Sequence, residues 1–202
     1  MELDCLQDDE HYERLLISDT SYYNSKARFV RIENAVFTRV HWQHSELQGI
    51  SINDVRFENC DFSNCNWSKC TMNRVEFLSC RMTGMRMTES KISNVLLQDC
   101  KCDMLQVSAS KLNVLRFEKC NLSEADFRQA ELHSTIFRNC NLTDAEFYES
   151  RFEQSDFRSS RVREMKLNPQ DWRGATLDSQ QLLELAEQFA LSWGIKIDDS
   201  AV

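Results

Sequence analysis

Cysteine is the residue whose type and spacing first suggest chemistry in this 202-residue chain. Thiolates bind zinc, form disulfides and act as nucleophiles. Five of the nine cysteines recur every twenty residues, at Cys60, Cys80, Cys100, Cys120 and Cys140. Cys65 and Cys70 follow Cys60 at intervals of five, which puts the three on successive faces of anything that repeats every twenty residues, whereas a tetrahedral zinc site needs its ligands together. We therefore predict no metal site and no cofactor.

The other residues that could do chemistry give no clearer signal. His41 and His44 flank the apolar Trp42, and His11 and His133 have no obvious partner in the sequence. There is no glycine-rich phosphate loop and no recognisable Ser/His/Asp or Cys/His motif. The sequence therefore predicts a protein that is not an enzyme.

The cysteine spacing belongs to a more extensive pattern that must set the fold. Phenylalanines run beside the cysteines with the same period, at Phe37, Phe57, Phe77, Phe117, Phe137 and Phe157. Within that period, large apolar residues occupy nearly every fifth position from Ile32 to Leu177, which makes thirty units in one phase. A helix needs an apolar period near 3.6 and a strand needs 2, so a period of five fits neither. It describes a chain that turns a corner every five residues, a square tube whose core contains the cysteine and phenylalanine ladders.

Glycine and proline, the residues that usually build tight turns, are rare in this sequence. The chain contains four glycines and one proline. We therefore expect the turns to be built by repetition rather than by unusual backbone dihedrals.

Several pentads resemble the consensus A-(D/N)-L-X-X of the pentapeptide-repeat family. They are Cys60-Asp61-Phe62-Ser63-Asn64, Cys120-Asn121-Leu122-Ser123-Glu124, Ala125-Asp126-Phe127-Arg128-Gln129, Cys140-Asn141-Leu142-Thr143-Asp144 and Ala145-Glu146-Phe147-Tyr148-Glu149. The resemblance covers about 150 of the 202 residues. It implies an all-β fold, a right-handed quadrilateral β-helix with four pentads per coil, which the twenty-residue ladders also require.

The two ends of the sequence differ from this solenoid. Residues 1–29 carry apolar residues that look out of phase, such as Leu15, Leu16 and Ile17, and are predicted to form an N-terminal cap before a β-helix over 30–178. Residues 179–202 are predicted to form a short C-terminal α-helix and tail. Asp178 is the expected N-cap, with Gln181 three residues on and Gly194 at the helix end.

The C-terminal helix has two interpretations. It could cap the last coil and do nothing else, or its second apolar surface could join two chains. The sequence resembles the MfpA and Qnr branch of the family, in which this segment joins two rods end to end, and this implies a homodimer. The residues predicted to form the dimer contact are Leu183, Ala190, Trp193, Ile195 and Ile197.

Charge decides what partner the rod would bind. The same branch imitates duplex DNA and occupies the DNA-binding surface of gyrase, which protects that enzyme from quinolones or toxins. Duplex DNA carries one negative charge per ~1.7 Å of axis, so a mimic needs roughly three net negative charges per ~4.8 Å coil. The chain has a net charge of −8, but residues 30–178 contribute only −1, residues 1–29 contribute −4 and residues 179–202 contribute −3.

One stretch of the rod is more acidic than the rest. Residues 121–149 have a net charge of −4, a density that reaches that of DNA. We call its six carboxylates the acidic patch: Glu124, Asp126, Glu131, Asp144, Glu146 and Glu149. The cations in the same stretch are Arg128 and Arg138. Asp126 and Glu146 are twenty residues apart and are expected to stack on one face. This patch predicts gyrase or topoisomerase IV as a partner.

The alternative is a protein-interaction scaffold with a different partner. The central coils have mixed charge, and apolar residues are expected on their surface at Leu78, Leu96, Val114 and Ile136. Net acidity argues against direct binding to nucleic acid, and no apolar run reaches membrane-spanning length. The sequence opens on an acidic segment rather than a signal peptide, and eight cysteines fall at inward positions, so we expect reduced thiols and a cytoplasmic protein.

Overall fold

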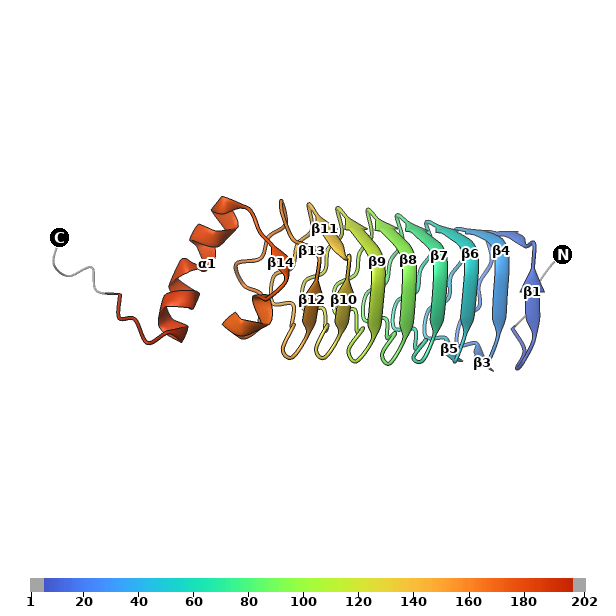
Figure 1. Ribbon diagram of the computed structural model, residues 1–202. Coiled ribbons are helices and arrows are strands. Elements are labelled where there is room, and N and C mark those ends of the chain that lie inside the picture. Colours follow the sequence, from blue (N-terminus) through green and yellow to red (C-terminus); the bar gives the residue numbers. More distant parts are fainter. Residues whose placement is uncertain (1–5, 198–202) are drawn as a thin grey trace.

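The computed structural model describes residues 6–197 as a rod of stacked parallel strands, with β1 at one end and α1 at the other (Figure 1). Most strands lie in one twelve-stranded sheet, and β3 pairs with β5 in a smaller one. The elements are β1 (His11–Glu13), β2 (Leu16–Ser18), β3 (Lys26–Arg28), β4 (Arg31–Thr38), β5 (Glu46–Gln48), β6 (Ser51–Glu58), β7 (Thr71–Leu78), β8 (Lys91–Gln98), β9 (Lys111–Glu118), β10 (Glu131–His133), β11 (Ile136–Arg138), β12 (Arg151–Glu153), β13 (Ser155–Asp156), the 3₁₀ helix η1 (Pro169–Trp172), β14 (Ala175–Thr176) and α1 (Ser179–Ser192).

The strand register has a constant offset of twenty residues. Ile32 pairs with Ile52, and Phe37 pairs with Phe57. The same offset continues through β6, β7, β8 and β9, so each coil contains four pentads. The predicted fold, a right-handed quadrilateral β-helix with one short C-terminal helix, is confirmed.

The corners of the coil use unusual dihedrals, contrary to the expectation from composition. Every fifth residue from Asp9 to Ser159 has a positive φ, and twenty-nine of these residues are not glycine. The left-handed conformation costs a non-glycine residue roughly 1–2 kcal/mol. Most corner amides donate to the next coil, as in Arg39 N to Glu58 O at 2.8 Å and Asn64 N to Thr83 O at 2.9 Å. Stacking therefore holds dihedrals that a single coil could not keep.

The predicted core ladders lie inside the rod, and all eleven of their side chains are buried. The rings of Phe37, Phe57 and Phe77 stack with centroids 5.2 and 5.0 Å apart. The cysteine thiols donate to carbonyls of the previous coil, for example Cys60 Sγ to Phe37 O at 3.4 Å. All eight cysteines within residues 6–197 are free and buried.

The solenoid begins earlier than the predicted cap boundary at residue 30. Tyr12 pairs with Ile32, Ile17 with Phe37, and Ala27 with Leu47, so residues 11–28 are in phase with the coil that follows. The sequence pattern concealed this because Ala27 is small for a pentad centre. Leu16 also obscured the phase of the repeat, because this apolar side chain points outward and is 84% exposed.

The C-terminal end departs from the repeat at the pentad centred on Trp172. Pro169 has no amide to offer the ladder, and residues 169–172 form η1 instead of a strand. Register returns where Ala175 of β14 pairs with Ser155 of β13. The helix α1 then starts as predicted, with the Asp178 carboxylate accepting from Gln181 N at 3.0 Å.

The helix α1 closes this end of the rod (Figure 1). The buried Gln181 amide donates to Phe157 O and Ser160 O, both at 2.7 Å, and so replaces a missing coil. Leu185, on the same helix, is fully buried. No helix within residues 6–197 is both long and apolar enough to span a membrane.

Candidate acidic interface

The acidic patch lies on two adjoining faces of the coils nearest α1. Asp126 and Glu146 are bridge partners on neighbouring coils, so they stack as predicted. Glu124 and Asp144 both occupy left-handed corners, twenty residues apart, beside that pair. Glu149 occupies the next corner, and Glu131 begins β10 on the face beyond it. The structure therefore brings four of the six carboxylates together in two short columns.

Cations from the same and neighbouring coils are bound to these carboxylates. Arg128 donates from Nε and Nη2 to the Asp126 carboxylate, at 2.9 Å each, and its Nε lies 3.5 Å from Glu146. Lys166 Nζ lies 3.4 Å from Asp144 and 3.8 Å from Glu146. The patch is thus a network of both signs.

The partly buried Asp126 is the most constrained of the six. Burial alone raises its pKa, but the hydrogen bonds from Arg128 outweigh burial and lower the pKa below the usual range. Its side chain is only 17% exposed, compared with 51% for Asp144. An incoming partner would meet Asp144 first.

The other two members of the patch lie toward its edge. Lys111 Nζ lies 3.1 Å from Glu131, one coil away. Glu149 accepts a hydrogen bond from the Gln129 side chain at 2.9 Å. Beside them is a shallow groove of about 400 Å³, lined by Ser108, Ala109, Arg128, Gln129, Tyr148 and Glu149.

Counting charges along the sequence missed two of the cations. Lys166 lies twenty residues after Glu146, and Lys111 lies twenty before Glu131. A count by columns of the coil would have included both. Arg138 was set against the patch by the sequence count but acts on Asp156. The hydrogen bonds from Arg158 are the main cause of the lowered pKa of Asp156, and the charge of Arg138 lowers it a little further.

The residues predicted for dimer formation lie on α1 and the segment after it. Leu183 is 77% exposed and Trp193 75% exposed. Ile195 and Ile197 are each about half exposed, and Ala190 is partly buried. The helix therefore buries one stripe against the rod and leaves a second apolar stripe on its surface.

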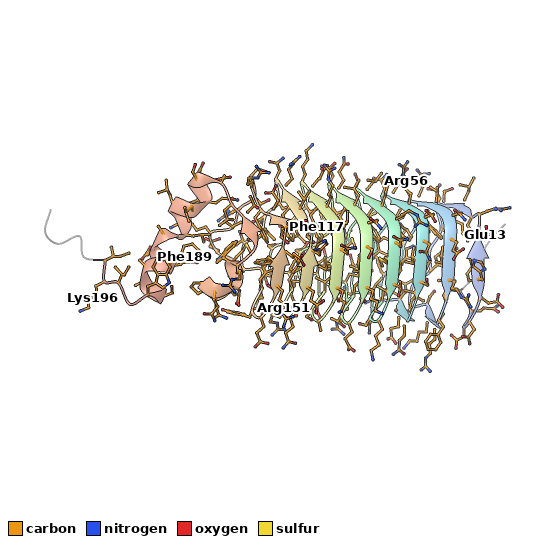
Figure 2. The ribbon with its side chains drawn as sticks, viewed as in Figure 1. Glu13, Arg56, Phe117, Arg151, Phe189 and Lys196 are labelled. Carbon is orange, nitrogen blue, oxygen red and sulfur yellow. The ribbon has the colours of Figure 1, made fainter. Side chains whose placement is uncertain are left out.

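Charged side chains cover the outside of the rod, as Arg56 and Arg151 illustrate (Figure 2). Many pair with the next coil, as in Arg74 with Asp54 at 2.5 Å and Arg56 with Glu76 at 2.7 Å. Exposed ion pairs of this kind contribute about 0–1 kcal/mol each. Their main effect is to leave the central coils with little net charge.

A groove of about 570 Å³ crosses strands β4, β6, β7, β8 and β9. Leu96 and Val114, two of the apolar surface residues predicted from the sequence, line it, whereas Leu78 and Ile136 are partly buried outside it. Val114 has a φ of 56° and is 47% exposed. Among the corner residues described, it alone is β-branched, and this conformation is a true outlier for such a side chain.

Two further observations concern bound groups and thiols. Within residues 6–197, no three His, Cys, Asp or Glu side chains gather where they could hold a metal ion. Burial raises the pKa of the Cys65 and Cys70 thiols to about 11. These thiols are therefore protonated at neutral pH.

A parallel β-solenoid that closes a coil with every four pentads defines the class of protein. The chain belongs to the pentapeptide repeat family: a family model described as a pentapeptide repeat region matches residues 50–119 and 113–186, and a second, described as pentapeptide repeats in eight copies, matches residues 28–66. No curated protein matches the sequence.

Solved structures of the same fold are distant in sequence. A trypsin-treated QnrB1, described as a plasmid-mediated fluoroquinolone resistance protein, is 19% identical, with 94% of this chain and 100% of that chain covered and a TM-score of 0.42. HetL, described as a pentapeptide repeat protein involved in heterocyst differentiation regulation in the cyanobacterium Nostoc, is 13% identical, with 84% of each chain covered and a TM-score of 0.43. These likenesses concern the fold alone.

Proposed function

We propose that this protein is a non-catalytic interaction rod that binds DNA gyrase or topoisomerase IV as a DNA mimic, and thereby modulates the enzyme or protects it from quinolones or toxins. The observation that supports this is the pair of carboxylate columns, Glu124 with Asp144 and Asp126 with Glu146. Columns one coil apart repeat every ~4.8 Å. A surface that binds the phosphates of duplex DNA would bind such an array through the same lysines and arginines.

Arg128 and Lys166 set how strongly this surface can act. They hold three of the four column carboxylates, so a partner's cations must compete with them. Replacing Arg128 by glutamine frees Asp126 and adds one net negative charge. In the proposed mechanism this variant binds the enzyme more tightly than the wild type does.

The test is a DNA supercoiling assay with purified gyrase, with and without a quinolone. We expect inhibition or drug rescue by the wild type, and a loss of about tenfold or more in potency, equal to 1.4 kcal/mol, when Asp144, Glu146 and Glu149 are changed to lysine. The matched control changes Asp54, Glu76 and Glu89, which lie in the central coils, to lysine. Equal effects of the two triple variants would show that net charge, not the patch, is responsible.

We also propose that the rod forms a homodimer through α1. Leu183 and Trp193 are the exposed members of the apolar stripe, the partly buried Ala190 lies with them on α1, and Ile195 and Ile197 extend the stripe. A dimer joined there would bring the two acidic patches toward one junction and lengthen the acidic surface. Trp193→Asp is expected to halve the mass measured by sedimentation at micromolar concentration, whereas Leu16→Asp, at the other end of the rod, leaves it unchanged.

A second candidate function is a scaffold for a different protein, and Val114 is the observation that favours it. A strained, exposed valine lies beside Leu96 in a 570 Å³ groove, at a corner whose left-handed backbone asparagine or aspartate adopts more readily. Val114→Asn is expected to stabilise the fold by about 1 kcal/mol, since it relieves strain of 1–3 kcal/mol. If the groove is the binding surface, the same variant loses its partner while gyrase inhibition by the patch is unchanged.

A further inference from the structure

The N-terminal end of the rod presents a sheet edge that no other described strand covers. β1 and β2 pair only with β4, and β3 pairs only with β5. In the inner coils, the first amide of each pentad donates to the coil before it, as Arg31 N does to Glu10 O and Val36 N to Leu15 O, both at 2.9 Å. By the same register, the amides of His11 and Leu16 point away from the rod.

Natural proteins blunt sheet edges with short strands, charged side chains, proline, lysine or a bulge that twists the strand away. The strands β1 and β2 are three residues each and have acidic neighbours, but they carry no proline and no lysine. The first residue of β2 is Leu16, whose outward side chain is 84% exposed. The core beneath is closed, because Leu6 is 4% exposed and belongs to the main apolar cluster. The open feature is therefore the backbone edge and not the core.

We propose that β1 and β2 accept an extended basic segment of a partner protein by β-strand addition. Backbone hydrogen bonds supply the affinity in this kind of recognition, and alternate side chains supply the specificity. The charges of this end select the occupant. Asp8, Asp9, Glu10 and Glu13 lie within six residues at the edge, and two copies placed end to end here would oppose these carboxylates.

The register defines which side chains the added segment must carry. Position 13 is occupied by Glu13 and is followed one coil later by Glu33. Arg14 Nε lies 3.3 Å from Glu13, and His11 Nε2 lies 3.5 Å from Glu33. A lysine or arginine at this position of the added strand therefore competes with Arg14 for the exposed Glu13 carboxylate. Position 16 continues the apolar pair Leu16 and Val36 and favours leucine or valine. Position 14 is a left-handed corner, where asparagine is well tolerated.

The probe is a fluorescent octapeptide that copies β8 with lysine at its third position, Lys-Ile-Lys-Asn-Val-Leu-Leu-Gln. Fluorescence anisotropy with the full chain is expected to show saturable binding that weakens with added salt, because part of the attraction is electrostatic. A matched peptide with glutamate at the third position is expected to bind at least tenfold more weakly. No saturation by the lysine peptide up to millimolar concentration would overturn the proposal.

Two substitutions at position 16 distinguish the contribution of the backbone amide to peptide binding from that of the side chain. Leu16→Pro removes only the outward amide, and a proline whose missing amide faces solvent is tolerated on an edge strand. It is expected to reduce peptide binding about tenfold, whereas Leu16→Thr, which keeps the amide, reduces it less than threefold. Equal affinities for the two variants would rule out strand addition.

Further controls cover a folding defect and the rival occupant. If Leu16→Pro fails to fold, N-methylation of the peptide at its second and seventh residues is the alternative. These residues occupy the pentad position whose amide donates to the following coil, as Tyr22 N does to His41 O at 2.7 Å and Leu47 N to Asn66 O at 2.8 Å, so their methylation removes two of the peptide's donors to the rod and is expected to abolish binding. Unchanged affinity of that peptide would contradict the proposal. A Leu16→Pro variant with half the sedimentation mass of the wild type would also contradict the proposal, because a second copy of this chain would then be the occupant of the edge.

Discussion

The two ends of the rod solve different halves of one problem. A solenoid must close its apolar core and must also satisfy the backbone groups of its terminal coil. At the C-terminal end both are done: Trp172 and Leu185 cover the core, and Gln181 serves the last carbonyls. At the N-terminal end Leu6 covers the core, while the edge of β1 and β2 stays open among the described residues. Core closure and edge closure are therefore separable, and the edge of β1 and β2 is where we propose that a partner strand adds.

The largest expected effect concerns core closure. Trp172→Ala removes a side chain whose ring lies 5.7 Å from Phe157 and 6.3 Å from Phe152, and truncation of a buried tryptophan costs about 3–5 kcal/mol. Leu6→Ala at the other end should cost about 2 kcal/mol or more. Urea unfolding followed by circular dichroism measures both. Trp193→Ala, a matched exposed tryptophan, should leave the free energy of unfolding nearly unchanged in the monomer.

Edge closure at the C-terminal end has the next largest effect. Gln181→Leu preserves approximate volume but removes the side-chain donor of Ser160 O and leaves Phe157 O with the Ser160 amide alone, at 3.1 Å. It also removes the acceptor of the Asp178 amide. Loss of the donor to a buried acceptor costs about 1–3 kcal/mol. The control is Gln180→Leu, since the Gln180 amide is exposed and bonds only to Glu184 at 3.2 Å. If the two variants unfold at the same urea concentration, the glutamine does not take the place of a coil.

Hydrogen exchange tests the contrast between the ends with a smaller signal. Opening free energies in a native protein range from about zero at frayed elements to the full global value in the core. Amides of β1 and β2 are expected to exchange faster than those of β10 and β11, which lie on the same two faces of the coil near the C-terminal end. Uniform protection along the rod would mean that the N-terminal edge is as well satisfied as the covered one.

The sequence was sufficient for the inside of this molecule and less so for its ends and surface. A strict period of five fixed the coil, because burial repeats at every pentad regardless of which residues decorate the outside. It failed at the first coil, where Ala27 is small and Leu16 points outward, and at η1, where Pro169 interrupts the ladder. It also left Lys166 out of the acidic patch, since charges that meet across coils are twenty residues apart in the sequence. Surface chemistry in a solenoid has to be read down its columns.

The smallest effect is the pH dependence of the C-terminal closure. The backbone amides of Gln181 and Ser159 donate to the Asp178 carboxylate and lower its pKa. A carboxyl whose folded pKa is depressed stabilises the fold above its unfolded pKa of about 3.9, and this contribution disappears as pH falls through the folded value. Asp178→Asn keeps an oxygen acceptor but cannot titrate, so its melting temperature should fall less than that of the wild type between pH 5 and pH 2. Glu187→Gln removes a carboxylate from the same helix without touching the cap. If acid lowers the melting temperatures of Asp178→Asn and Glu187→Gln by the same amount, the carboxyl group responsible is not Asp178.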